Sequence, residues 1–369
     1  MTVFTRSRAG KVYGAIAVAS VSALLLAGCA SGGTTTEPTE SQAPVAEDLT
    51  LKIGTVLPQS GSLAFLGPPE EAGVLLAVNE VNEAAKNLTI DFTPGDSGDA
   101  DNKAFETTVP KLQNAGVSAM IGAAASGVTK LFLDSNVDAG IITFSPANTS
   151  PDFTTWDDDN LYWRTAPSDL LQGEVLGNLI AEDRHKNIGI LYQNDAYGTG
   201  LFGVIKEVFE STGGTVVAEA SYNDGDSSFD AQVSTIAAAN PDAVVLITFD
   251  QFATIAPLLA NAGVSPENYY LVDGNLKQWG DDVSVSLEGA KGTTPGPVLE
   301  SDFQGRLNDA WTEAGNAELD DYSYAAESYD AVILLALASL AAGSSEGADI
   351  ATKLQEVSGG AGEGTKCTS

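Results

Sequence analysis

The residue types that most often carry chemistry are scarce in this chain. It contains one histidine, His185, and two cysteines, Cys29 and Cys367. Zinc sites use three or four ligands, mainly Cys and His, so a Cys/His metal site is not expected. His185 lies between Arg184 and Lys186. This charged surrounding predicts a surface residue rather than a catalytic base.

The sequence also lacks the patterns of the common enzyme mechanisms. It shows no set of nucleophile, base and orienting group, no metal motif and no nucleotide-binding loop. Gly198, Gly200 and Gly203 have the spacing of a dinucleotide fingerprint, but a single match to this short pattern is a weak signal. We therefore expect neither an enzyme nor a cofactor or metal site.

The N-terminal segment predicts export and lipid attachment. Three basic residues precede an apolar run over 12–26, which is shorter than the about 20 residues that span a membrane. A basic start, a short apolar core and small residues at the cut are typical of a secretory signal peptide, here 1–28. Leu26-Ala27-Gly28-Cys29 resembles the bacterial lipobox, whose cysteine receives a diacylglycerol and becomes the first residue after cleavage. The alternative is an ordinary cleavage site with an incidental cysteine.

Composition predicts how the rest of the chain relates to the membrane. Residues 29–48 are mostly Ser, Gly, Thr, Pro and Glu, which predicts a flexible tether behind a lipid anchor on the extracytoplasmic face. Without 1–28 the chain holds 14 basic and 50 acidic residues, a formal net charge of −36. This excess of acidic residues disfavours binding to nucleic acid and charge-driven docking onto anionic lipid. A solvated, self-repelling surface explains it.

From Leu49 onward, short β-type runs alternate with amphipathic stretches. The predicted strands are 49–57, 88–93, 117–122, 141–144, 187–192, 215–222, 243–248 and 269–272. The predicted helices are 68–86, 101–114, one from 128, 171–182, one around 201–208, 229–239, 252–262 and one around 322–340. Regular β-α-β alternation implies parallel sheets with helices on both faces. Since about 320 residues exceed a single core, the predicted α/β fold has two lobes.

The loops after the predicted strands are the expected place for a ligand. Ligands of such sheets bind beyond the carboxyl ends of the strands. These loops are rich in Gly, Ser, Thr, Asn and Asp, and they cover 58–67, 123–129, 145–151, 193–200, 249–252 and 273–277. Each is ordinary turn sequence by itself. The indication of a binding site is that all six loops should lie at the same end of the sheets.

Four short motifs occur in the chain, each once, and their order and spacing along the sequence are specific. They are Ile53-Gly54-x-x-x-Pro58-x-x-Gly61 with Gly67 and a helix ending Ala77-Val78-Asn79-Glu80-Val81-Asn82, then Phe144-Ser145-Pro146-Ala147-Asn148-Thr149-Ser150-Pro151, Tyr162-Trp163-Arg164-Thr165, and Asn194-Asp195-x-Tyr197-Gly198-x-Gly200. Together they resemble the type I periplasmic binding proteins of the leucine/isoleucine/valine-binding kind, the substrate-binding subunits of ABC importers, over 49–340. The resemblance implies two Rossmann-like lobes joined by a multi-strand hinge. The N-terminal lobe would be 49–167 with 296–369, and the C-terminal lobe 168–295.

The resemblance also implies an amino-acid site shared between the lobes. Its ligand-binding residues would be Ser126, Ala147, Thr149, Tyr197, Phe249 and Asp273. The ligand carboxylate would meet the Ser126 hydroxyl at a helix start, the Ala147 backbone, and the backbone and hydroxyl of Thr149, groups that suit an anion. Asp273 would pair with the ligand ammonium beside aromatic rings, which suit a cation. A zwitterion bridging both halves would stabilise the closed form.

Two residues depart from the family pattern. Asp273 is one methylene shorter than the usual glutamate, and Phe249 lacks the hydroxyl of the usual tyrosine. Taken without the resemblance, Ser126 is an ordinary helix N-cap and Asp273-Gly274 an ordinary turn.

The C-terminus departs as well. Related chains continue beyond the helix around 322–340 to further strands and a last crossing between lobes, whereas this sequence stops in a Gly-rich stretch. We expect either a truncation that removed the partner of Cys367 or a naturally short variant. If Cys29 carries lipid, Cys367 has no partner within the chain.

The predicted function is capture of an amino acid, branched-chain ones included, or a similar small polar ligand, for delivery to ABC permease subunits. One alternative is an amide or urea ligand. Asp273 discriminates between the two, because a neutral ligand gives a buried carboxylate nothing to neutralise. Another alternative is a sensor domain that docks to a membrane kinase or receptor. Neighbouring genes for permease and ATPase subunits would favour import.

Overall fold

The computed structural model describes residues 48–85 and 87–361, and these contain two separate five-stranded sheets in which every strand pairing is parallel. The first sheet has the order β2-β1-β3-β4-β5 and is built from β1 (Leu49–Val56), β2 (Leu88–Thr93), β3 (Ala119–Gly122), β4 (Ile142–Ser145) and β5 (Tyr162–Arg164). All residues of β3 and β4 are buried, as expected for parallel strands covered on both faces. The predicted parallel α/β architecture is confirmed.

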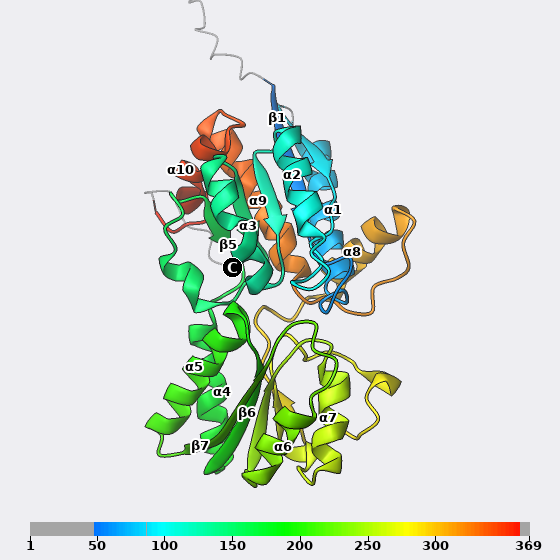
Figure 1. The fold of residues 1–369 in the computed structure, drawn as a ribbon. Helices are drawn as coiled ribbons and strands as arrows, with labels where there is room; N and C mark the ends of the chain where they lie inside the picture. Colours follow the sequence, from blue (N-terminus) through cyan, green and yellow to red (C-terminus); the bar gives the residue numbers. More distant parts are fainter. Residues whose placement is uncertain (1–47, 86, 362–369) are drawn as a thin grey trace, which may run out of the picture. The chain divides into compact units, whose positions relative to one another are not determined.

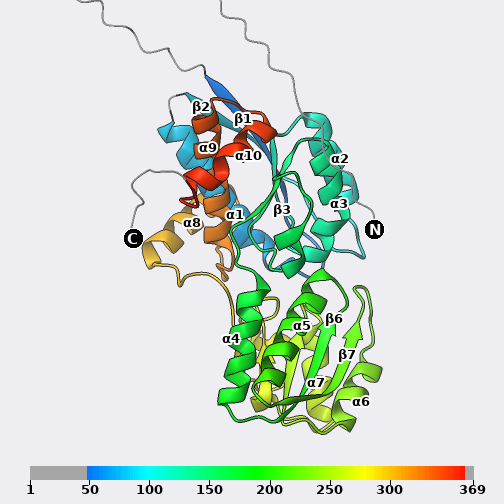
Figure 2. The same ribbon diagram turned by 90° about the vertical axis from the view of Figure 1, so that its left-hand side faces the viewer.

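Helices cover both faces of the first sheet (Figures 1 and 2). They are α1 (Gly67–Ala84), α2 (Phe105–Ala115), α3 (Ser126–Asp138), α9 (Ala325–Ala342) and α10 (Gly347–Val357). One apolar cluster joins α1, α9 and α10 to the strands, and another joins α2 and α3 to the opposite face. A further helix, α8 (Ser301–Glu313), packs against α1. The C-terminal helices therefore complete the layers around the N-terminal strands.

Helix α9 is the one described helix that is long and apolar enough to cross a membrane. It lies against the first sheet, and Ala331, Val332 and Leu335 are fully buried there. Its apolar character is therefore explained by its place in the core.

The second sheet has the order β10-β9-β8-β6-β7. Its strands are β6 (Asn187–Gln193), β7 (Thr215–Tyr222), β8 (Ala243–Ile247), β9 (Tyr269–Leu271) and β10 (Lys291–Gly292). One apolar cluster attaches α4 (Asp169–Glu182) and α5 (Ala196–Ser211) to one face of this sheet, and another attaches α6 (Asp230–Ala238) and α7 (Phe252–Asn261) to the other. Short 3₁₀ turns occur at Pro151–Thr155, Pro266–Asn268 and Gly280–Asp282.

Two segments, 165–168 and 293–300, connect the elements of the two sheets within the described residues. The first separates β5 from α4, and the second separates β10 from α8. The proposed division into lobes at 167/168 and 295/296 falls inside these two segments. The predicted signal peptide over 1–28, Cys29, all of the predicted 29–48 tether except Asp48, and Cys367 lie outside the described residues.

Some predicted boundaries were wrong. The helix expected over 101–114 begins at Phe105, because the Asp99 carboxylate accepts hydrogen bonds from the N–H groups of Asp101 and Asn102 and holds a turn there. Strands β5 and β10 were not predicted, since runs of three and two residues show no periodicity. Helices α8 and α10 were also missed.

Candidate functional site

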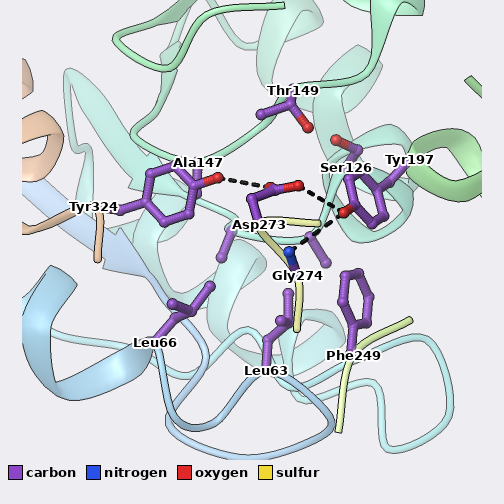
Figure 3. Close-up of a pocket in the computed structure, with 12 residues that line it drawn as sticks. Leu63, Leu66, Ser126, Ala147, Thr149, Tyr197, Phe249, Asp273, Gly274 and Tyr324 are labelled. Atoms are coloured by element: carbon purple, nitrogen blue, oxygen red, sulfur yellow. Dashed lines mark hydrogen bonds between the residues drawn. The ribbon is translucent and has the colours of Figure 1, made fainter. Parts of the chain in front are cut away.

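One pocket collects residues from the loops and helix starts that follow six strands, and from the segment before α9. Figure 3 shows the residues that line it. They are Leu63, Leu66, Ala124, Ala125, Ser126, Ala147, Thr149, Tyr197, Phe249, Asp273, Gly274 and Tyr324. All six predicted ligand residues are among them. The enclosed space is about 10 Å³, about enough for one water molecule.

Ser126 is the first residue of α3 rather than its N-cap. Ala125 occupies the N-cap position, and its side chain makes no capping hydrogen bond. The Ser126 Oγ accepts a long hydrogen bond of 3.4 Å from the N–H of Ser150. Its own hydroxyl hydrogen has no acceptor in the described part of the chain, and it lies at the positive end of α3, where an anion is favoured.

The two loops that carry Ser126 and Thr149 are tied together by buried hydrogen bonds. The Asn148 side-chain amide donates to the carbonyls of Ala123 (2.9 Å) and Ala124 (2.8 Å). The Ser145 hydroxyl donates to the Ala123 carbonyl at 2.7 Å. Arg164 donates to the carbonyls of Asn148 and Ser150 at 3.1 and 2.8 Å. These bonds fix one wall of the pocket before any ligand enters, which lowers the ordering cost of binding.

Thr149 is held by a carboxylate that sequence reasoning did not identify. Its Oγ1 donates to Asp169 Oδ2 at 2.9 Å, and Asp169 is fully buried at the start of α4. While Asp169 is ionised, the Thr149 hydroxyl has only lone pairs to offer a ligand, because its single hydrogen is engaged. That hydroxyl then suits an ammonium better than a carboxylate.

Asp273 enters the pocket from the turn after β9 of the second sheet, and two tyrosines hold its carboxylate. Tyr197 donates to Oδ1 and Tyr324 donates to Oδ2, both at 2.7 Å. Figure 3 shows Asp273 between the two hydroxyls. The Gly274 N–H donates to the Tyr197 hydroxyl at 3.3 Å. A Cβ at Gly274 would lie 2.9 Å from the Phe249 ring and from a backbone oxygen, so glycine permits this close packing.

Phe249 supports the aromatic side of the pocket. Its ring stacks on that of Tyr197 with centroids 5.4 Å apart and an interplanar angle of 15°. Both side chains are almost completely buried. Phe249 has no hydroxyl where related proteins usually carry tyrosine, and its ring instead makes an apolar contact that fixes the Tyr197 ring.

The two buried carboxylates influence each other. Burial raises the pKa of Asp273, and the hydrogen bonds from Tyr197 and Tyr324 oppose that rise. Burial and the charge of Asp273 raise the pKa of Asp169 well above its ordinary value, while the Thr149 hydrogen bond opposes the rise. Burial also raises the pKa of both tyrosines, which keeps them protonated as donors. A cation brought between these carboxylates would favour their ionised forms.

Tyr324 is the lining residue that sequence reasoning missed most completely. It precedes α9, more than 120 residues after Tyr197, and no motif marks it. Its backbone is left-handed, with φ of +60°, which is unusual for a bulky residue. Such conformations are found at binding sites, where the surrounding structure holds them in place.

Two further observations concern metal ligands and the single histidine within 48–85 and 87–361. That part of the chain has no group of three or more His, Cys, Asp or Glu side chains arranged to hold a metal ion. His185 is partly exposed, and its ring meets that of Tyr270 edge-on at 5.7 Å. It lies on the second sheet's side, away from the residues that line the pocket.

Comparisons with known proteins identify the family of the chain. The sequence model of a family described as "Periplasmic binding protein" matches residues 50–364. A leucine-, isoleucine-, valine-, threonine- and alanine-binding protein of Pseudomonas aeruginosa is 31% identical over 189 residues, which cover 51% of this chain and 50% of that protein. The chain thus spans about half the length of this relative. A Leu/Ile/Val-binding protein homologue of Brucella suis is 28% identical over 323 residues, 82% of each chain.

A solved structure shows the same likeness in three dimensions. It is the substrate-binding protein of a branched-chain amino acid transporter from Streptococcus pneumoniae, in complex with isoleucine. It superposes with a TM-score of 0.67 at 25% identity, covering 84% of this chain and 88% of that one.

Two parallel sheets with a pocket at their carboxyl ends define the two-lobed α/β class of binding proteins. This chain belongs to the periplasmic binding protein family. The two relatives described above are named as a binding protein and a binding-protein homologue.

Proposed function

We propose that this protein is an extracytoplasmic solute-binding protein that captures an amino acid and delivers it to an ABC importer. The observation that carries the proposal is that the pocket brings together polar groups from the elements of both sheets. Elements of the first sheet offer the Ser126 hydroxyl at the start of α3, and those of the second offer the Asp273 carboxylate after β9. Opposite charges on one small ligand suit these two groups.

The carboxylate of the ligand would bind at the α3 side. Ser126 supplies a hydroxyl hydrogen, and the helix N-terminus supplies a favourable dipole. The ammonium would bind between Asp273 and the lone pairs of the Thr149 hydroxyl, since that hydroxyl donates to Asp169. Tyr197 and Tyr324 would keep Asp273 in position.

Entry requires a conformational change. A cavity of about 10 Å³ holds no amino acid, whereas sites for small ligands commonly measure several hundred Å³. The lining residues come from loops of both sheets, and the chain crosses between them in only two segments, 165–168 and 293–300, of the described part. We infer that the lobes separate about these segments to admit the ligand.

A titration of the purified full chain tests the proposal. The probes are L-leucine, L-isoleucine, L-valine and L-lysine, with acetamide and urea as neutral comparisons. We expect at least one amino acid to bind with 1:1 stoichiometry by calorimetry and to raise the unfolding temperature, because a ligand that binds only the folded state stabilises it. Binding of urea or acetamide with no amino acid bound would contradict the proposal.

The membrane anchor is a separate part of the proposal, since Cys29 lies outside the described residues. Relatives named as binding proteins for transported amino acids support a location outside the cytoplasm. We expect Cys29→Ser to move the protein from the membrane fraction to the soluble fraction and to abolish labelling by a radioactive fatty acid. Cys367→Ser is the matched control and should retain both. Unchanged labelling of Cys29→Ser would refute lipidation at this residue.

A further inference from the structure

A second and larger cavity adjoins the ligand pocket. Its volume is about 280 Å³, and residues from both sheets line it. Leu63, Ala125 and Phe249 line both cavities, so these three apolar side chains form their common wall. We call this second space the acidic cavity.

Three carboxylates line the acidic cavity: Asp99 from the first sheet's side, and Asp195 and Asp224 from the second's. Within residues 48–85 and 87–361, none of them forms an ion pair with Lys or Arg. Burial and the charge of Asp224 raise the pKa of Asp195 to about 6. Burial and the charges of Asp99 and Asp101 raise the pKa of Asp224 to about 6 as well.

The nearby cation is engaged elsewhere. Lys277 lowers the pKa of Asp250, which burial raises. Its Nζ, however, lies 4.5 Å from the ring centroid of Phe65 and 4.4 Å from that of Trp279. Lys277 does not line the acidic cavity. Among the described residues, no Lys or Arg is therefore ion-paired with the carboxylates of the acidic cavity.

An independent observation indicates that the acidic cavity receives a polar group. Ser62 lines it, and this residue is only 7% exposed. Its Oγ is buried and has no hydrogen-bond partner in the described part of the chain. A buried hydroxyl without a partner costs free energy unless a bound group satisfies it.

We propose that the acidic cavity binds the cationic end of a basic amino acid such as lysine, ornithine or arginine. This inference rests on the proposed function, because it assumes that the α-amino and α-carboxyl groups occupy the ligand pocket. An apolar stem would pass the wall of Leu63, Ala125 and Phe249. A terminal ammonium or guanidinium would then meet the carboxylates and the Ser62 hydroxyl. Basic side chains have this shape, an apolar stem with a charged head.

An organic cation suits the cavity better than a metal ion. The acidic residues of the described ranges form no group arranged to hold one. The carboxylates also have structural partners. Asp195 accepts from the Gly198 N–H at 2.8 Å, and Asp224 accepts from the Ala100 N–H at 3.0 Å. Each therefore presents a fixed acceptor to a donor such as an ammonium.

Calorimetry on the full chain with L-lysine and L-norleucine tests the proposal. Norleucine has the α-amino and α-carboxyl groups and a four-carbon side chain, but lacks the terminal amine. We expect lysine to bind at least tenfold more tightly than norleucine. Asp224→Asn should reduce that preference about tenfold, since Asn removes the charge and keeps an oxygen for the Ala100 N–H. Asp91→Asn, at an exposed residue of β2, removes the same charge and should leave the preference unchanged.

The possible outcomes separate this inference from the proposed function. Equal affinities for lysine and norleucine, or an equal loss of both in Asp224→Asn, would overturn the inference and leave amino-acid binding intact. Absence of binding by every amino acid would overturn the proposed function and this inference with it. Ser62→Ala gives a second check that removes no charge. We expect Ser62→Ala to weaken lysine binding a few-fold and to leave norleucine binding the same. Unchanged affinity for both ligands, or an equal loss of affinity for both, would count against a role of the acidic cavity.

Discussion

The ligand pocket and the acidic cavity share three apolar side chains but differ in how their polar groups are satisfied. In the pocket, both oxygens of Asp273 accept hydrogen bonds from tyrosines, and Thr149 bonds to Asp169. In the acidic cavity, the Ser62 hydroxyl has no partner in the described residues, and the carboxylates have no ion pair there. The enclosed volumes are about 10 and 280 Å³.

The difference indicates a division of labour. Groups whose hydrogen bonds are fixed in advance bind a ligand with little reorganisation, which suits the part of an amino acid that all amino acids share. A roomier space with unpaired charge suits the part that varies among them. Recognition of the common zwitterion and selection of the side chain would then rest on different residues.

The largest expected effect comes from Asp273→Asn. The change keeps the shape of the side chain and removes the charge that would pair with the ligand ammonium. Removing one partner of a buried charge pair costs about 3–5 kcal/mol, so amino-acid affinity should fall at least about a hundredfold. Isothermal titration with the tightest-binding amino acid measures this loss.

Asp224→Asn is the matched comparison for Asp273→Asn. It also removes one carboxylate charge, but at the acidic cavity. If the two spaces differ as argued, Asp273→Asn weakens every amino acid, and Asp224→Asn weakens the basic ones selectively. If Asp273→Asn bound amino acids with unchanged affinity, Asp273 would not be the residue that pairs with the ligand ammonium.

A smaller effect is expected from Tyr324→Phe. The change removes one hydrogen bond to the Asp273 carboxylate, and hydrogen bonds to charged groups contribute about 1.5–3 kcal/mol. We expect a loss of about 1–2 kcal/mol in the free energy of unfolding, measured with urea, and a weaker affinity for the ligand. Tyr192→Phe is the control, because the Tyr192 ring stacks on Phe202 at 4.4 Å and its hydroxyl has no hydrogen bond in the described part of the chain. Equal losses in both variants would show that the Tyr324 hydroxyl has no special role.

The fold could be predicted from the sequence where elements are long enough to show a pattern. Strand β8 is five apolar residues long and fully buried, and α2 buries Phe105, Val109 and Leu112 at helical spacing. Strands β5 and β10 could not be predicted, because two or three residues have no period. The start of α2 was misplaced since side-chain bonds from Asp99 hold a turn, and such bonds depend on rotamers that the sequence does not show.

The site could be predicted only where residues belong to a recurring motif or a loop after a strand. Thr149 and Asp273 lie in such loops and Ser126 directly follows one, and the parallel topology brings these segments together. Tyr324 and Asp169 do not, and Asp169 resembles an ordinary acidic residue in the first turn of a helix. The direction of the Thr149 hydrogen bond also had to come from the structure. It shifts the expected role of that hydroxyl from the ligand carboxylate toward the ammonium.

The smallest predicted effect, a pH dependence of stability, separates the acidic cavity from the rest of the surface. The pKa values of Asp195 and Asp224 are about 6 in the folded protein, above the ordinary value of about 3.9 for Asp. Protonation of these two carboxyl groups therefore stabilises the fold. The contribution is complete below about pH 4 and is lost as the pH rises through 6. We expect the unfolding temperature to fall by roughly 2–4 °C between pH 5 and 7. The double variant Asp195→Asn/Asp224→Asn should reduce this slope without abolishing it, because the pKa values of Asp169 and Asp273 are raised as well. Asp91→Asn, which removes one charge at an exposed residue of β2, should keep the slope. Saturating L-lysine should also reduce the slope, since a bound cation favours the ionised carboxylates. A slope that is the same in the double variant and the unmodified chain would place its origin outside the acidic cavity.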